Sequence, residues 1–133
     1  MERVHRFEFT VPPEAADGNR HVNNVAYVRW MQEAAIRHAD ECGCTKLTHE
    51  AGASWVVRTH RIEYFRTAFP GEVLVVETWV ENFRKVRSLR RYRFTRTADQ
   101  AVVAEGETDW VYVDAESGRP RPIPPAMEAM FRG

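Results

Sequence analysis

One short polar segment of the sequence gathers residue types that can act on a carbonyl group. It runs just ahead of a predicted helix and contains Asp17, Asn19, His21, Asn23 and Asn24. The Asp17 carboxylate can act as a nucleophile or as a general base toward water, and His21 can orient water or shuttle a proton. Free N–H groups at the start of the helix would stabilise a developing oxyanion. The same residues can instead be structural, because Asp17 can form an Asx turn, Asn19 can adopt a left-handed conformation and Asn23 can cap the helix.

The pattern of apolar residues predicts the elements that position this segment. Alternation over 4–11 indicates a strand, and spacings of three and four from Val25 to Cys42 indicate one long helix that ends at Gly43. Four later stretches rich in β-branched and aromatic residues, joined by short turns, indicate antiparallel hairpins: 54–66, 73–83, 86–97 and 101–113. A short helix is expected over 125–131, whereas 45–52 has no clear preference. We therefore expect an α+β fold, a five-stranded antiparallel sheet wrapped around one long helix, in a single domain over residues 1–133.

Composition excludes several classes of function. The 19 Lys+Arg balance 19 Asp+Glu, so the chain lacks the positive excess that general binding to nucleic acid or to anionic membranes requires. No uncharged apolar run approaches the ~18 residues of a membrane span, and no signal-peptide-like stretch opens the sequence. Cys42 and Cys44 are expected to remain reduced, because their spacing would strain a disulfide and cannot supply a four-ligand zinc site. We expect a cytoplasmic protein that uses no metal or cofactor.

The polar segment resembles the active-site segment of hotdog-fold thioesterases. Its residues Asp17-x-Asn19-x-His21-Val22-Asn23-Asn24-Val25-x-Tyr27 are most similar to the Asp-x-Asn-x-His-Val-Asn-Asn segment of plant-type acyl-carrier-protein thioesterases. They also resemble the Asp-x-x-Gly-His-Val-Asn-Asn form of the 4-hydroxybenzoyl-CoA thioesterase family. Later segments resemble that family's later strands and tail in the same order: 62–66, 70–72, 110–114 and 123–125. The resemblance implies a hotdog fold and hydrolysis of an acyl-CoA or acyl-carrier-protein thioester.

The resemblance also implies a role for each matching residue. Asp17 is implied to be the essential carboxylate, which attacks the thioester carbonyl or activates water, with Asn19 and His21 as polar partners. The backbone N–H near Asn24 is implied to polarise the thioester carbonyl. One departure is Arg20, which stands where the commoner bacterial motif has glycine.

A second departure concerns the plant-type enzymes, which carry an acid and a cysteine where this sequence has Thr67 and Ala68. A hydrolytic mechanism here would therefore depend on the carboxylate of the polar segment. In the family, strands of a partner subunit line the same pocket, so a homodimer is implied, or a tetramer built as a dimer of dimers. Thr59 and His60 are the candidate substrate-binding residues on such a strand, and Tyr27 of the motif is a further candidate substrate-binding residue.

The arginines between Arg84 and Arg96 allow two interpretations. The first is a solvated strand face, because Arg87, Arg91 and Arg93 share one parity while Ser88, Tyr92 and Phe94 share the other. The second is that Arg84, Lys85 and Arg87 bind phosphates of CoA or phosphopantetheine, since guanidinium pairs bidentately with phosphate oxygens. In that case these cations should lie at the mouth of a pocket whose floor carries Asp17.

Three other functions remain as alternatives. A hotdog hydratase or dehydratase would act on a similar acyl thioester, but that class generally places Asp and His farther apart than Asp17 and His21. A non-catalytic acyl-CoA-binding module would bind ligand through the arginines and turn nothing over. A nucleic-acid-binding module is favoured by the arginines and opposed by neutrality and by the lack of a recognition helix.

Overall fold

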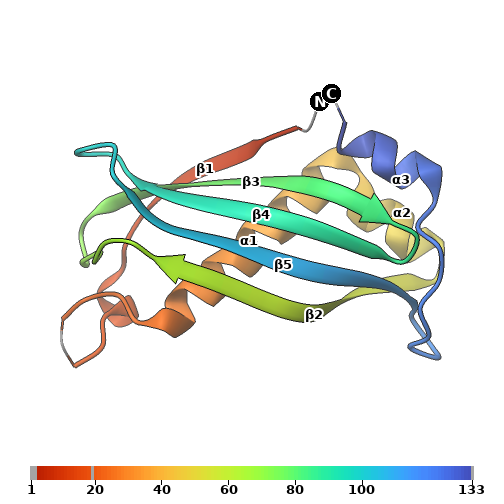
Figure 1. Cartoon of the computed structure of the whole chain (residues 1–133), viewed down its shortest axis with the longest axis horizontal. Coiled ribbons are helices and arrows are strands. Elements are labelled where there is room, and N and C mark those ends of the chain that lie inside the picture. Colours follow the sequence, from red (N-terminus) through yellow and green to blue (C-terminus); the bar gives the residue numbers. More distant parts are fainter. Residues whose placement is uncertain (1–2, 19, 133) are drawn as a thin grey trace.

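Five strands form one antiparallel sheet whose order differs from their order along the chain (Figure 1). The structure is a computed structural model that describes residues 3–18 and 20–132. The strands are β1 (His5–Thr10), β2 (Ala53–Tyr64), β3 (Val73–Arg84), β4 (Arg87–Arg96) and β5 (Val102–Asp114). They lie in the order β1-β3-β4-β5-β2, so that β1 and β2 form the edges. The predicted α+β architecture is confirmed.

The long helix α1 (Asn24–Cys42) lies across one face of the sheet (Figure 1). Asn23 caps it and Gly43, at φ 93°, ends it, as the sequence predicted. The remaining helices are short: η1 (Pro13–Ala15), α2 (Cys44–Glu50) and α3 (Pro125–Met130). Helix α2 was not expected, because seven residues are too few to display a helical period. It is stabilised by packing, and Nε1 of Trp55 donates a hydrogen bond to its Thr48 side chain (3.1 Å).

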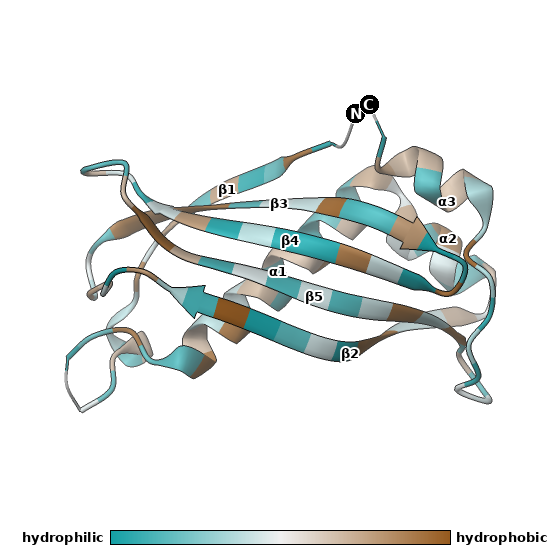
Figure 2. Ribbon diagram, in the orientation of Figure 1, coloured by the Kyte–Doolittle hydropathy of each residue, from teal (hydrophilic) through white to brown (hydrophobic). Residues whose placement is uncertain are grey.

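The core lies between α1 and the sheet. Hydrophilic and hydrophobic residues are interspersed along the strands (Figure 2), as expected for strands with one buried and one solvated face. Met31 of α1 is fully buried and lies over Gly106 of β5. A Cβ atom at Gly106 would lie 3.0 Å from Sδ of Met31 and 3.1 Å from the carbonyl oxygen of Arg61. The missing side chain at Gly106 thus lets α1 approach the middle of the sheet.

Cross-strand ion pairs occupy the solvated face of β4. Arg93 pairs with Glu105 at 2.8 Å, and Arg91 lies 3.5 Å from Glu81 and 3.7 Å from Glu107. The strand-face interpretation of the arginine cluster is therefore confirmed for Arg91 and Arg93.

The state of the two thiols agrees with the expectation from the sequence. Cys42 and Cys44 are unpaired, and burial raises the pKa of both thiols. Within residues 3–18 and 20–132, no helix is both long and apolar enough to cross a membrane.

Candidate active site

The predicted site segment folds into a tight turn that brings Asp17 and His21 together. The Asp17 N–H donates to the carbonyl of His21 (3.1 Å), and the Arg20 N–H donates to the carbonyl of Asp17 (3.0 Å). Arg20 has φ 69°, in the left-handed region that favours glycine, at the position where the bacterial motif has glycine. Oδ1 of Asp17 lies 4.0 Å from Nδ1 of His21, and the two side chains are 37% and 40% exposed. Both groups can therefore meet a substrate arriving from solvent. Asn19 lies outside the described residues, so its predicted role is not placed.

Backbone hydrogen bonds fix this turn at the start of α1. The Val22 N–H donates to the carbonyl of Ala68 (2.9 Å), and Oδ1 of Asn23 accepts from the Ala26 N–H (3.0 Å). The helix then begins at Asn24. Apart from the Ala26 N–H, which Asn23 caps, the N–H groups of its first turn have no intrahelical acceptor. These N–H groups and the positive end of the helix dipole can stabilise negative charge on a carbonyl oxygen beside the turn.

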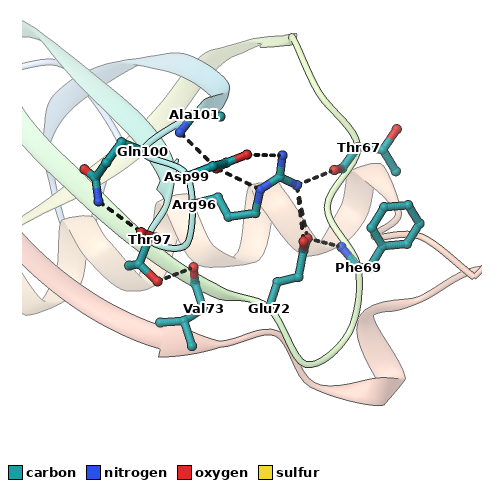
Figure 3. Close-up of polar contacts among 9 residues, drawn as sticks. All are labelled: Thr67, Phe69, Glu72, Val73, Arg96, Thr97, Asp99, Gln100 and Ala101. Carbon is teal, nitrogen blue, oxygen red and sulfur yellow. Dashed lines mark hydrogen bonds and ion pairs between the residues drawn. The ribbon is translucent and has the colours of Figure 1, made fainter.

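Arg96 holds the loop on which the turn rests (Figure 3). Its Nη1 donates to the carbonyl of Thr67 (3.1 Å) and to both carboxylate oxygens of Glu72 (3.3 Å each). Glu72 also accepts from the Phe69 N–H (2.8 Å). The Phe69 ring meets the His21 imidazole edge-on, with centroids 6.4 Å apart. The sequence analysis did not single out Arg96, since its partners are distant in the chain.

The three predicted substrate-binding residues outside the arginine cluster lie in different surroundings. Tyr27 is 3% exposed in the core, where it packs edge-on against Phe94, and burial raises its pKa to about 12. Thr59 is exposed on β2 beside a register shift. His60 is half-buried with Nδ1 2.9 Å from Oγ1 of Thr108, and burial lowers its pKa. Their contacts with a substrate stay predictions.

The cations predicted to bind phosphate lie at the opposite end of the sheet from the Asp17 turn. Arg84 ends β3 and Lys85 follows it in the β3–β4 turn, and both are exposed. Arg87 is paired with Asp109, and this hydrogen-bonded carboxylate raises the pKa of the guanidinium. Figure 1 shows the β3–β4 turn and the segment before α1 at opposite ends. A single chain therefore does not place these cations at a pocket mouth above Asp17, because β3 carries them the length of the sheet.

A separate cavity of about 430 Å³ lies beside the C-terminal half of α1. Most of its lining is apolar, including Ala35, Ala39, Trp55, Val80 and Phe131. Neither Asp17 nor His21 lines it, and its charged lining includes Arg90.

The sequence analysis did not single out Arg90 either. Arg90 is 4% exposed on β4, on the same buried face as Ser88, Tyr92 and Phe94. Its position could have been predicted from the alternation along the strand, because Arg90 falls on the same face as Ser88 and Tyr92. The general expectation that arginines are exposed obscured this.

A family model of the thioesterase-like superfamily matches residues 11–131. The chain belongs to this superfamily. A search of curated proteins found no significant match. Among the described residues of this thioesterase-like chain, no group of three or more His, Cys, Asp or Glu side chains is placed to hold a metal ion.

Solved structures of other proteins share the fold of this thioesterase-like chain. A 1,4-dihydroxy-2-naphthoyl-CoA thioesterase from Synechocystis has a TM-score of 0.86 and 16% identity, over 97% of this chain and 96% of that one. A Staphylococcus aureus protein solved in complex with CoA has a TM-score of 0.86 and 14% identity, over 98% of this chain and 82% of that one. A candidate oleoyl thioesterase from Lactobacillus plantarum has a TM-score of 0.91 and 17% identity, over 98% of this chain. This chain spans 51% of that protein, about half its length. The predicted hotdog fold is thereby confirmed.

Proposed function

We propose that this thioesterase-like chain hydrolyses an acyl-CoA or acyl-carrier-protein thioester, with Asp17 as nucleophile or general base. The observation that carries the proposal is the Asp17–His21 pair, 4.0 Å apart in a turn at the N-terminus of α1. A carboxylate beside an imidazole and beside free helix N–H groups supplies both an attacking group and a site for the oxyanion.

In the general-base form of the reaction, Asp17 takes a proton from a water molecule while the oxygen of that water attacks the thioester carbon. The carbonyl oxygen becomes an oxyanion, which the N–H groups near Asn24 stabilise. Collapse of this intermediate breaks the C–S bond, and the leaving thiolate takes up the proton that Asp17 received. In the nucleophilic form Asp17 attacks the carbon itself, the thiolate leaves, and water hydrolyses the resulting anhydride. His21 orients the water in either form.

The edge position of β2 supports a homodimer. This strand has twelve residues, whereas the opposite edge strand β1 has six. Val56 on β2 is 45% exposed. An unpaired strand edge of this length readily pairs with another, and a twofold axis would join two β2 strands antiparallel. We propose this dimer as the functional unit, with a dimer of dimers as its larger form.

Such a dimer would complete the site. The residues just before α1 lie beyond the β2 edge, near the end of that strand (Figure 1). The cavity lies near its beginning, because Ala53, Ser54 and Trp55 contribute to the lining. Antiparallel pairing sets the end of one β2 opposite the beginning of the other. The Asp17 turn of one protomer would then face the cavity of its partner.

The carrier group and the cellular location belong to the same proposal. The exposed Arg84 and Lys85 remain the candidates for the phosphates of CoA or phosphopantetheine, whereas Arg87 would have to leave Asp109. A cytoplasmic location stays a prediction.

Replacing the carboxylate tests the activity directly. Asp17→Asn should lower kcat/KM at least about 100-fold on every thioester that the wild type hydrolyses, because the amide can neither attack nor take a proton. Glu14→Gln is the matched control, since Glu14 is an exposed acid shortly before the same turn. The assay would cover short, long, branched and aromatic acyl-CoAs and the corresponding acyl-carrier proteins. Normal hydrolysis by Asp17→Asn with an intact fold would contradict the carboxylate mechanism.

A further inference from the structure

Arg90 is a buried cation in the wall of the cavity. Its Nη1 donates to Nδ1 of His38 (2.9 Å) and to Oγ1 of Thr78 (3.0 Å). The guanidinium carbon lies 5.5 Å from the centroid of the Phe131 ring. Within the described part of the chain, neither Nε nor Nη2 forms a hydrogen bond, and no carboxylate lies within 4.0 Å of the guanidinium. Three of its five N–H donors are therefore available to a ligand.

The surroundings of Arg90 leave its charge uncompensated. His38 is neutral near pH 7, because burial and the neighbouring Arg90 lower its pKa to about 3. His5 stacks on His38 with ring centroids 5.4 Å apart. The carboxylate of Glu41 lies 2.9 Å from Nδ1 of His5, but Glu41 is 71% exposed and pairs with His5 rather than with Arg90. The acid on the cavity lining is Asp40, which is exposed and accepts a hydrogen bond from Thr45 (2.6 Å). A buried guanidinium without an anionic partner is costly, so an anion that enters this cavity would be strongly favoured.

The rest of the cavity sets the shape of the ligand that carries this anion. Apart from Arg90, the walls of the cavity are mainly apolar and aromatic, with Ala39, Trp55 and Phe131 among them. Methylene groups would pack against such walls, and a terminal carboxylate would pair with a guanidinium in bidentate geometry.

We propose that the cavity takes the acyl part of the substrate and that Arg90 binds a carboxylate at the far end of that acyl group. The preferred substrates are then ω-carboxyacyl thioesters, the half-thioesters of dicarboxylic acids. This inference rests on the proposed function and names its substrate class. A methyl-terminated acyl chain would fill the apolar part and leave the Arg90 charge without a partner, so it binds more weakly.

Paired substrates test the proposal without any variant. Each pair has the same number of carbons and differs only in its last group: succinyl-CoA with butyryl-CoA, adipyl-CoA with hexanoyl-CoA, and suberyl-CoA with octanoyl-CoA. The wild type should show a kcat/KM at least tenfold higher for the carboxylated member at the best chain length, as expected for a hydrogen bond to a charged group. Equal or higher activity on the methyl-terminated member at every length would overturn the proposal.

Variants then assign the preference to Arg90. Arg90→Met keeps most of the volume and removes the charge, so it should abolish the preference while retaining hydrolysis of the methyl-terminated substrates. Arg93→Met is the matched control, because Arg93 lies on the opposite face of β4 in an ion pair with Glu105. A folded Arg90→Met that keeps the wild-type preference would overturn the proposal. If Arg90→Met does not fold, the comparison of kcat/KM between the paired substrates on the wild type tests the proposal.

Ligand binding separates failure of this inference from failure of the proposed function. Calorimetry with hexanoate against hexan-1-ol needs no catalysis and can be run on the wild type and on Asp17→Asn, since the two ligands have the same number of carbons and only hexanoate carries a carboxylate. Tighter binding of hexanoate, lost in Arg90→Met, would support the anion site even if no thioester is hydrolysed. Hexanoate binding no tighter than hexan-1-ol binding would overturn it, whatever the hydrolytic activity.

Discussion

Nη1 of Arg90 and Nδ1 of His38 lie 2.9 Å apart in the interior, where both residues are 4% exposed. Since arginine always donates, His38 must accept with an unprotonated Nδ1. Protonation of His38 would place two cations against each other, and burial alone already disfavours the charged imidazole. This relationship makes the stability of the fold sensitive to mild acid.

We predict that the free energy of unfolding falls as the pH is lowered from 6.5 toward 3. His38 in the unfolded chain takes up a proton near its ordinary pKa of 6.5, whereas in the folded chain its pKa is about 3. The unfolded state therefore binds more protons across this window, and this one group contributes up to about 1.4 kcal/mol per pH unit.

Denaturant titrations at several pH values measure this slope. His38→Gln keeps a hydrogen-bond acceptor that does not titrate. Unfolding of this variant should therefore take up about one proton fewer, and its free energy should depend less steeply on pH. His49→Gln is the control, because His49 is exposed on α2. Equal slopes for His38→Gln and the wild type would contradict the prediction.

Arg96→Met should loosen the loop that supports the active-site turn. The variant loses the hydrogen bonds to Thr67, Glu72 and Asp99. We expect the free energy of unfolding to fall by about 1 kcal/mol, allowing for solvent screening of this partly exposed network. We also expect kcat/KM to fall in the fraction of the protein that remains folded, because the active-site turn loses its support. Arg93→Met, which removes a simple surface ion pair, is the comparison. Equal losses in both variants would show that the Arg96 network has no special role.

Gly106→Ala should weaken the contact between α1 and the sheet. The added methyl would lie 3.0 Å from Sδ of Met31 and 3.1 Å from a backbone oxygen that cannot readily move. Overpacking of this kind costs about 1–3 kcal/mol, measured by denaturant unfolding. Gly18→Ala is the control, because a Cβ atom there meets nothing within 4 Å. Unchanged stability of Gly106→Ala would mean that α1 shifts without cost.

Val56→Glu should dissociate the proposed dimer while leaving the protomer folded. Val56 is 45% exposed on the β2 edge, so a charge is tolerated in the monomer but would be buried in a β2–β2 interface. Val4→Glu places the same change at a valine that is 52% exposed just before the other edge strand. Light scattering gives the mass of each variant. A dimer of Val56→Glu as tight as that of the wild type would exclude pairing through β2.

Loss of the dimer carries a second expectation. If the Asp17 turn acts on a substrate held in the partner's cavity, a monomeric Val56→Glu should lose activity in proportion to its dissociation. Raising the protein concentration should restore both together. Full activity in the monomer would place the complete site within one chain.

Local signals made much of the fold and part of the site predictable. The alternation along β3 and β4, the Asn23 cap and the Gly43 stop are set by neighbouring residues, and each was found at its predicted place. The Asp17–His21 proximity is also local, because the two residues are only four positions apart in the sequence. Helix α2 escaped prediction, since its stability comes from packing on β2.

The strands, the long helix, the polar turn at the start of α1 and the family resemblance could all be predicted, because each depends on the order of nearby residues. The surroundings of Arg84, Lys85 and Arg90, in contrast, depend on contacts between residues far apart in the chain. Arg84 and Lys85 lie far from Asp17 because β3 runs the length of the sheet. Arg90 is buried because its place on β4 directs its side chain toward α1. There it donates hydrogen bonds to His38 of α1 and to Thr78 of β3. Burial of a charge is a property of three-dimensional surroundings, and those surroundings come from residues far apart in the chain.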